Sequence, residues 1–146
     1  MNPYSYVFFL IPFAVYLLVV LALMLNRKAR LKRIMAATRA MSIDTFLSKR
    51  KMHQLDNKAG IYILHNKTKD MNYVGQGDYV VSRAFKHFSG AGQGDVYADY
   101  KFGDRFTIKI IYLRGSGFFR LNSLEKTAIE ILDAYDYGYN KTHGNK

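Results

Sequence analysis

The chain begins with a long uncharged stretch, and this stretch limits its architecture more than any other feature. Residues 4–25 are 22 consecutive residues without a charged side chain, and most of them are apolar. As a helix rising about 1.5 Å per residue they extend about 33 Å, enough to cross a hydrocarbon layer of roughly 30 Å. We therefore expect one N-terminal transmembrane helix, with an anchor at 1–26.

Two other interpretations of this stretch are less favourable. A cleavable signal peptide carries basic residues before a shorter apolar core, and a small domain rarely buries so many uncharged residues on every face of a core helix. Here the basic residues follow the stretch, at Arg27, Lys28, Arg30, Lys32 and Arg33. Because a basic flank stays in the cytoplasm, we expect a single-pass inner-membrane protein with its N-terminus outside and the rest cytoplasmic.

The net charge of +11 is unevenly distributed. Residues 27–51 contain nine basic side chains and one acidic one, whereas residues 54–146 contain thirteen basic and ten acidic ones. We interpret 27–58 as a basic juxtamembrane linker or helix, whose charges attract anionic lipid and also a DNA backbone. The absence of cysteine excludes a disulfide framework and thiolate metal sites.

The remaining residues, 59–146, have the pattern of a small α+β domain. Two short β-rich runs at 60–64 and 71–75, separated by turn-forming residues, predict a hairpin. Apolar residues at strand or helix spacing predict a third strand at 106–113 and helices at 79–88 and from 122 or 123 to 135. Ser123 is expected to cap the last helix, and the glycine-rich segment 90–94 to interrupt the chain. The order β-β-α-β-α predicts a three-stranded sheet flanked by helices.

Two tripeptides in the predicted hairpin form a recognisable signature. Gly60-Ile61-Tyr62 opens the first strand and Tyr73-Val74-Gly75 ends the second. Further residues extend the pattern, namely Arg83 and His87 on the following helix, Glu125 on the last helix and Gly138-Tyr139-Asn140 near the end. Over residues 59–144 the sequence resembles the GIY-YIG nuclease family, with valine for the signature isoleucine. The resemblance implies a DNA endonuclease that uses Mg²⁺ or Mn²⁺.

The resemblance also implies roles for the charged residues. Glu125 is expected to hold the metal from the first, partly exposed turn of its helix; the alternative is an ordinary solvated carboxylate. Arg83 is expected to bind the phosphate through two parallel N–H donors, a geometry that lysine cannot reproduce. His87, one turn further along the same helix face, is expected to transfer a proton or contact the phosphate.

The uncharged residues of the pattern have expected roles too. Tyr73 is expected to activate water and Tyr62 to orient the water or the phosphate, although strand tyrosines also pack into cores. Asn140 is expected to fix a wall of the site by hydrogen bonds. Gly75 and Gly77 are expected to bind substrate by letting it approach the backbone closely.

The sequence therefore predicts a membrane-anchored endonuclease that hydrolyses phosphodiester bonds. A tether concentrates the domain at the inner membrane face, which favours incoming foreign DNA as the substrate. The main alternative is a non-catalytic membrane-tethered module that binds DNA or protein through the same scaffold, because a fold does not guarantee its chemistry. A purely structural or lipid-binding peptide leaves the spacing of the motifs unexplained.

Overall fold

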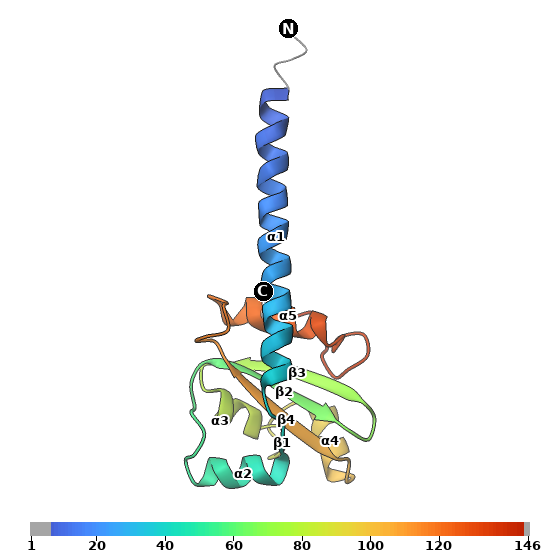
Figure 1. Ribbon diagram of the computed structural model, residues 1–146. Coiled ribbons are helices and arrows are strands. Elements are labelled where there is room, and N and C mark those ends of the chain that lie inside the picture. The colour runs from blue at the N-terminus through green and yellow to red at the C-terminus, as the bar shows by residue number, and fades with distance from the viewer. Residues whose placement is uncertain (1–6, 145–146) are drawn as a thin grey trace.

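A single helix, α1 (Val7–Ala37), runs from the apolar stretch into the basic region. The computed structural model describes residues 7–144; residues 1–6 of the predicted anchor and the last two residues of the predicted domain lie outside this range. Between Leu10 and Ala37, the most apolar 18 residues of α1 have a mean hydropathy of 2.1, and none of these residues is buried within the chain. The helix projects away from the other elements (Figure 1). It is long and apolar enough to span a membrane.

The sheet is antiparallel and has four strands in the order β1-β4-β2-β3. The predicted hairpin is confirmed as β2 (Gly60–Asn66) and β3 (Met71–Gly77), and β4 (Phe106–Tyr112) pairs with the other side of β2. The fourth strand, β1 (Met41–Ser42), pairs with β4. The prediction of three strands is therefore wrong, because a two-residue strand is too short to show an alternating pattern.

Helices cover both faces of the sheet (Figure 1). One face carries α2 (Ile43–Lys51), α3 (Val80–Phe85) and α4 (Gly94–Lys101), and the other carries α5 (Leu121–Ile131) and the inner part of α1. The alternating residues of β2 supply both cores. Tyr62 and Leu64 face the first group of helices, and Ile61 and Ile63 face α1 and α5.

Two expectations for the last helix were wrong, and one helix was missed. The glycine-rich segment interrupts the chain between α3 and α4, as expected, but the sequence did not indicate α4, which the Gln93 side chain caps by accepting a hydrogen bond from Val96 N at 2.7 Å. Helix α5 begins two residues before Ser123, after Arg120, whose side chain makes no capping bond. It also ends at Ile131 rather than near 135.

Part of the predicted linker is built into the domain. Leu31 and Met35 of α1 are buried in the core beneath α5. Polar contacts hold the same turns of α1, since Lys109 Nζ donates to Met35 O at 2.7 Å and Arg30 Nη2 donates to Gly115 O at 3.1 Å. The projecting helix and the domain are therefore joined by continuous helix rather than by a flexible segment.

Candidate active site

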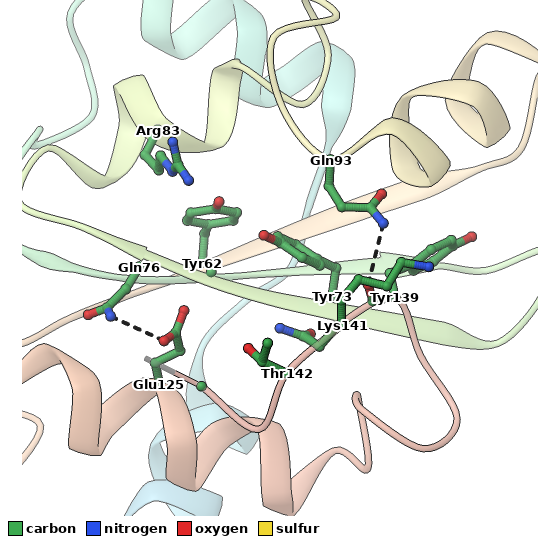
Figure 2. Close-up of a pocket in the computed structure, with 12 residues that line it drawn as sticks. Tyr62, Tyr73, Gln76, Arg83, Gln93, Glu125, Tyr139, Lys141 and Thr142 are labelled. Carbon is green, nitrogen blue, oxygen red and sulfur yellow. Dashed lines mark hydrogen bonds between the residues drawn. The ribbon is translucent and has the colours of Figure 1, made fainter. Parts of the chain in front are cut away.

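A pocket of about 200 Å³ opens at the outer edge of β3, where no other strand pairs. Figure 2 shows Tyr62 and Tyr73 on one side of β3, Glu125 of α5 on the other, and Arg83 of α3 above. The pocket includes six of the residues predicted to form the site, namely Tyr62, Tyr73, Gly75, Arg83, Glu125 and Asn140. The remaining two, His87 and Gly77, support residues that line it.

Strand register explains why the two tyrosines meet. Tyr62 lies opposite Gly75 and Leu64 lies opposite Tyr73, so all four residues occupy the same face of the hairpin. Gln76, the next residue after Gly75, points to the opposite face, toward α5. The pocket therefore straddles the edge strand, with phenols on one face and a carboxylate on the other.

The two predicted glycines make room for site side chains. A Cβ at Gly75 would overlap the phenol of Tyr62, which lies across this position. A Cβ at Gly77 would come within 3.0 Å of Cβ of Arg83. Gly75 lines the pocket, whereas the geometry gives Gly77 the role of letting α3 approach the sheet closely enough to present Arg83.

His87 is buried behind Tyr62, with 2% of its surface exposed. Its Nδ1 accepts a hydrogen bond from the backbone N–H of Gln93 at 3.0 Å, so the proton of the neutral ring resides on Nε2. Nε2 then donates to the Tyr62 hydroxyl oxygen at 2.7 Å. Both ring nitrogens are thus engaged inside the protein, and the geometry makes His87 a positioning group for Tyr62.

The two phenols differ in how their neighbours affect them. Burial raises the pKa of both hydroxyls. The Tyr62 hydroxyl, acting as a donor toward Tyr73, lowers the pKa of Tyr73 because it stabilises a negative Tyr73 oxygen, and the charge of Arg83 acts in the same sense. Tyr73 is therefore the phenol that loses its proton more readily.

Stability is expected to depend on pH through His87. Burial, followed by the charge of Arg83, lowers the pKa of His87 from 6.5 to about 4. Between these values the unfolded chain binds a proton that the folded chain does not, so acidification favours unfolding. We expect the free energy of unfolding to fall by up to about 3 kcal/mol as pH drops through this window.

Denaturant titrations of the detergent-solubilised chain across this range check that expectation. His87→Gln should flatten the pH dependence, whereas His53→Gln, at an exposed histidine, should leave it unchanged. Equal slopes in all three proteins would show that His87 is not the responsible group.

Glu125 is buried, with 6% of its surface exposed. The expectation of a partly exposed residue in the first turn is wrong, because α5 begins at Leu121 and places Glu125 in the second turn. Nε2 of Gln76 donates to Oε2 of Glu125 at 3.1 Å and to Oδ1 of Asn122 at 2.8 Å. Among residues 7–144, no group donates to the buried Gln76 Oε1.

Asn140 makes two hydrogen bonds with the backbone of β3. Its Oδ1 accepts from Val74 N and its Nδ2 donates to Val74 O, both at 2.8 Å. The side-chain amide thus takes the place of a neighbouring strand on the outer edge of β3. The backbone of Tyr139 adds a hydrogen bond from its N–H to Asn72 O at 2.9 Å.

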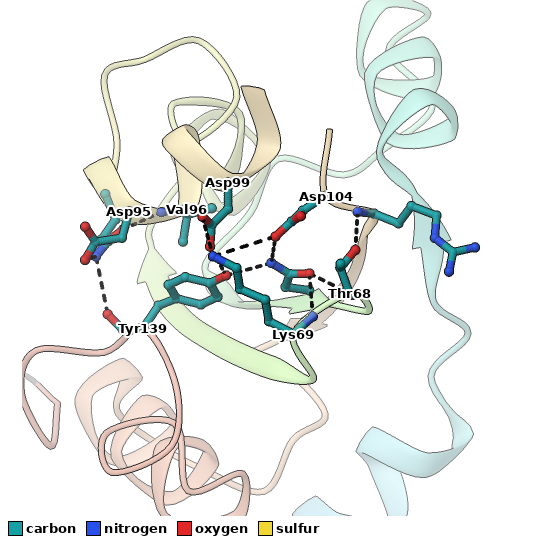
Figure 3. Close-up of polar contacts among 10 residues, drawn as sticks. Thr68, Lys69, Asp95, Val96, Asp99, Asp104 and Tyr139 are labelled. Carbon is teal, nitrogen blue, oxygen red and sulfur yellow. Dashed lines mark hydrogen bonds and ion pairs between the residues drawn. The ribbon is translucent and has the colours of Figure 1, made fainter. Parts of the chain in front are cut away.

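A polar network fixes the same C-terminal segment from its other side (Figure 3). The Tyr139 hydroxyl donates to Asp99 of α4 at 2.5 Å and accepts from Asn66 Nδ2 at 2.7 Å. Lys69, in the hairpin turn, pairs with Asp99 at 2.7 Å. The network connects α4, the hairpin turn and the C-terminal segment. It fixes Tyr139, the residue before Asn140, while Asn140 itself is bonded to β3.

Four further polar residues line the pocket that the sequence did not indicate, namely Gln76, Gln93, Lys141 and Thr142. Gln76 was detectable in principle because it lies between Gly75 and Gly77, and Lys141 because it follows Asn140 directly. Gln93 lies in a segment without strand or helix spacing. Only the folded chain shows that its backbone reaches His87 and its side chain caps α4.

The donor set fits one hard cation with incomplete protein coordination. No cluster of three His, Cys, Asp or Glu side chains occurs within the part of the chain that the structure describes. Glu125 supplies carboxylate oxygens and Gln76 Oε1 lies buried beside it. Oxygen donors suit Mg²⁺ or Mn²⁺, with water and substrate oxygens as the remaining ligands.

Comparisons with known proteins provide no additional assignment for this arrangement. No protein-family model, curated protein or solved structure matches the chain.

Proposed function

We propose that this chain is a membrane-anchored DNA endonuclease of the GIY-YIG type that depends on Mg²⁺ or Mn²⁺. One observation supports the proposal above all. Tyr62, Tyr73, Arg83 and Glu125 come from two strands and two helices, on both faces of the sheet, yet they line one pocket. Phenol, guanidinium and carboxylate are the groups needed for proton transfer, phosphate binding and cation binding.

The two phenols are assigned to activation of the attacking water. Tyr73 first loses its own proton to solvent and then, as a phenolate, accepts the proton of the attacking water; Tyr62 stabilises the phenolate by donating a hydrogen bond to it. His87 holds Tyr62 in this orientation through Nε2. Because burial raises the pKa of Tyr73, little phenolate forms at neutral pH without additional positive charge.

Arg83, and a cation that Glu125 would hold, are the proposed sources of this positive charge. Arg83 neutralises the phosphate as negative charge grows on its oxygens. Glu125 holds the cation, and Gln76 orients the carboxylate by donating to Oε2. When bound, the cation supplies positive charge that lowers the pKa of nearby hydroxyls and stabilises the pentacovalent phosphate.

The proposed location is the cytoplasmic face of the inner membrane, with the N-terminus of α1 outside. The order of charges supports this orientation, since five basic residues at 27–33 follow the apolar stretch and none precedes it. DNA entering the cell passes through this layer. Incoming foreign DNA is therefore the proposed substrate.

Purified full-length chain in detergent is expected to cleave plasmid DNA with Mg²⁺ or Mn²⁺ and to lose this activity with a chelator. Arg83→Lys keeps the charge but removes the two parallel donors, so turnover should fall about 10- to 100-fold while DNA affinity changes little. Gel analysis of plasmid and short duplexes measures both quantities. Arg105→Lys, at an exposed arginine outside the pocket, is the matched control.

Two results would contradict the proposal. Wild-type turnover by Arg83→Lys at saturating DNA would remove the arginine from the site. DNA binding without cleavage under any divalent cation would instead support the non-catalytic module on the same scaffold.

A further inference from the structure

Helix α5 lies beside α1 on the side of the domain from which α1 projects (Figure 1). Residues of α1, of α5 and of the segment before α5 line a hollow there. Its volume is about 440 Å³. Apolar side chains in its lining are Leu21, Met24, Leu25 and Phe118, and charged or polar ones are Arg27, Lys28, Ser123, Lys126, Thr127 and Glu130. We call this hollow the α1–α5 groove.

The order of the lining residues along α1 matches the two layers of a membrane surface. Leu25 is the last residue of the uncharged stretch, so Leu21, Met24 and Leu25 lie at the depth of acyl chains when α1 spans the bilayer. Arg27 and Lys28 emerge within the next turn, at the depth of the headgroups. The groove therefore crosses the boundary between hydrocarbon and polar layers.

Charge in the groove favours an anion. Arg27, Lys28 and Lys126 outnumber the single acid Glu130, which pairs with Lys28 at 3.9 Å. Arg27 and Lys126 are both exposed and, among the ion pairs found in residues 10–144, neither takes part. Their positive charge complements a phosphate group located between them.

An exposed aromatic side chain lies beside the groove. Phe119 follows the groove residue Phe118 and has 87% of its surface exposed. The Arg27 guanidinium lies 5.8 Å from the centre of its ring, which places the ring at the level where α1 leaves the apolar stretch. Aromatic rings at this level are favourable in the headgroup layer.

We propose that the α1–α5 groove binds one anionic phospholipid of the cytoplasmic leaflet, with the phosphate near Arg27 and Lys126 and an acyl chain along Leu21 and Met24. Phe119 enters the headgroup layer beside it. This gives the domain a second membrane contact, which fixes the α5 side against the bilayer. The inference rests on membrane insertion of α1 and is independent of nuclease activity.

Native mass spectrometry of the full-length chain in detergent, titrated with phosphatidylglycerol or phosphatidylcholine, tests the site. We expect the chain to bind one phosphatidylglycerol molecule more tightly than phosphatidylcholine. The double variant Arg27→Gln/Lys126→Gln should weaken this binding about tenfold or more, since each basic residue near an anionic surface contributes about 1 kcal/mol. Lys51→Gln/Lys101→Gln removes the same charge at exposed positions outside the groove and should have no such effect.

The chain contains no tryptophan, so Phe119→Trp provides a single reporter. In nanodiscs, the emission of this tryptophan should lie at shorter wavelength than that of tryptophan in water. Lipid brominated close to the headgroup should quench it. Water-like emission in the nanodiscs, or equal loss of phosphatidylglycerol binding in both double variants, would overturn the inference. Failure of α1 to enter nanodiscs would also overturn it, whereas DNA cleavage in detergent would be unaffected.

Discussion

Glu125→Gln is expected to reduce metal-dependent DNA cleavage by a factor on the order of 10³ or more, close to abolition. The amide keeps the volume of the carboxylate but removes the charge that holds the cation. Because Glu125 is buried, an alanine would also leave a cavity under β3, so the isosteric amide separates chemistry from packing. Steady-state cleavage of a short duplex, with Mg²⁺ varied up to high concentration, measures the loss.

Glu130→Gln is the matched control on the same helix, at an exposed carboxylate that pairs only weakly with Lys28. It should cleave at the wild-type rate. DNA affinity and the unfolding transition should be nearly unchanged in the Glu125 variant. Wild-type cleavage by that variant in Mg²⁺ would exclude Glu125 as the metal ligand and with it the proposed chemistry.

A fragment that starts at Gln54 is expected not to fold, whereas a fragment that starts at Arg27 is expected to keep the fold. The shorter fragment lacks four buried core side chains, namely Leu31, Met35, Ile43 and Phe46. Loss of one large core side chain typically costs 2 to 5 kcal/mol, about the range of the whole stability of a small domain. Circular dichroism and proteolysis of the two fragments measure the difference.

Leu31→Ala in the longer fragment tests the same contact without truncation. It should lower the free energy of unfolding by about 2 to 5 kcal/mol. Lys32→Ala, one residue further at an exposed position, should have little effect. A cooperatively folded fragment from Gln54 onward would show that α1 and α2 merely rest on an independent domain.

The sequence predicted the long elements of the fold and missed the short ones, for a physical reason. β4 and α5 carry apolar residues at strand or helix spacing, and the hairpin consists of two β-rich runs joined by turn-forming residues, with β2 buried on both faces. β1 has two residues, and α4 is short and begins at the last of three closely spaced glycines, so neither shows such a pattern. Their positions depend on partners distant in the chain, the edge of β4 for β1 and the network around Tyr139 for α4.

The candidate site shows a similar division. Motif spacing indicated Tyr62, Tyr73, Arg83 and Glu125, and the structure brings them to one pocket. Spacing could not show that the pocket straddles the edge strand or which nitrogen of His87 carries the proton. Those features arise from strand register and from a backbone N–H at Gln93, six residues away in a loop.

The continuity of α1 limits how the domain can move. Leu31 is buried in the domain only six residues, or about 9 Å of helix, beyond Leu25. In a bilayer, a domain joined to such a helix has two main motions, lateral diffusion and rotation about the membrane normal. The height of its pocket above the lipid stays nearly constant. In the proposed setting, the enzyme would search for substrate in two dimensions, and DNA would have to come to that height to be cut.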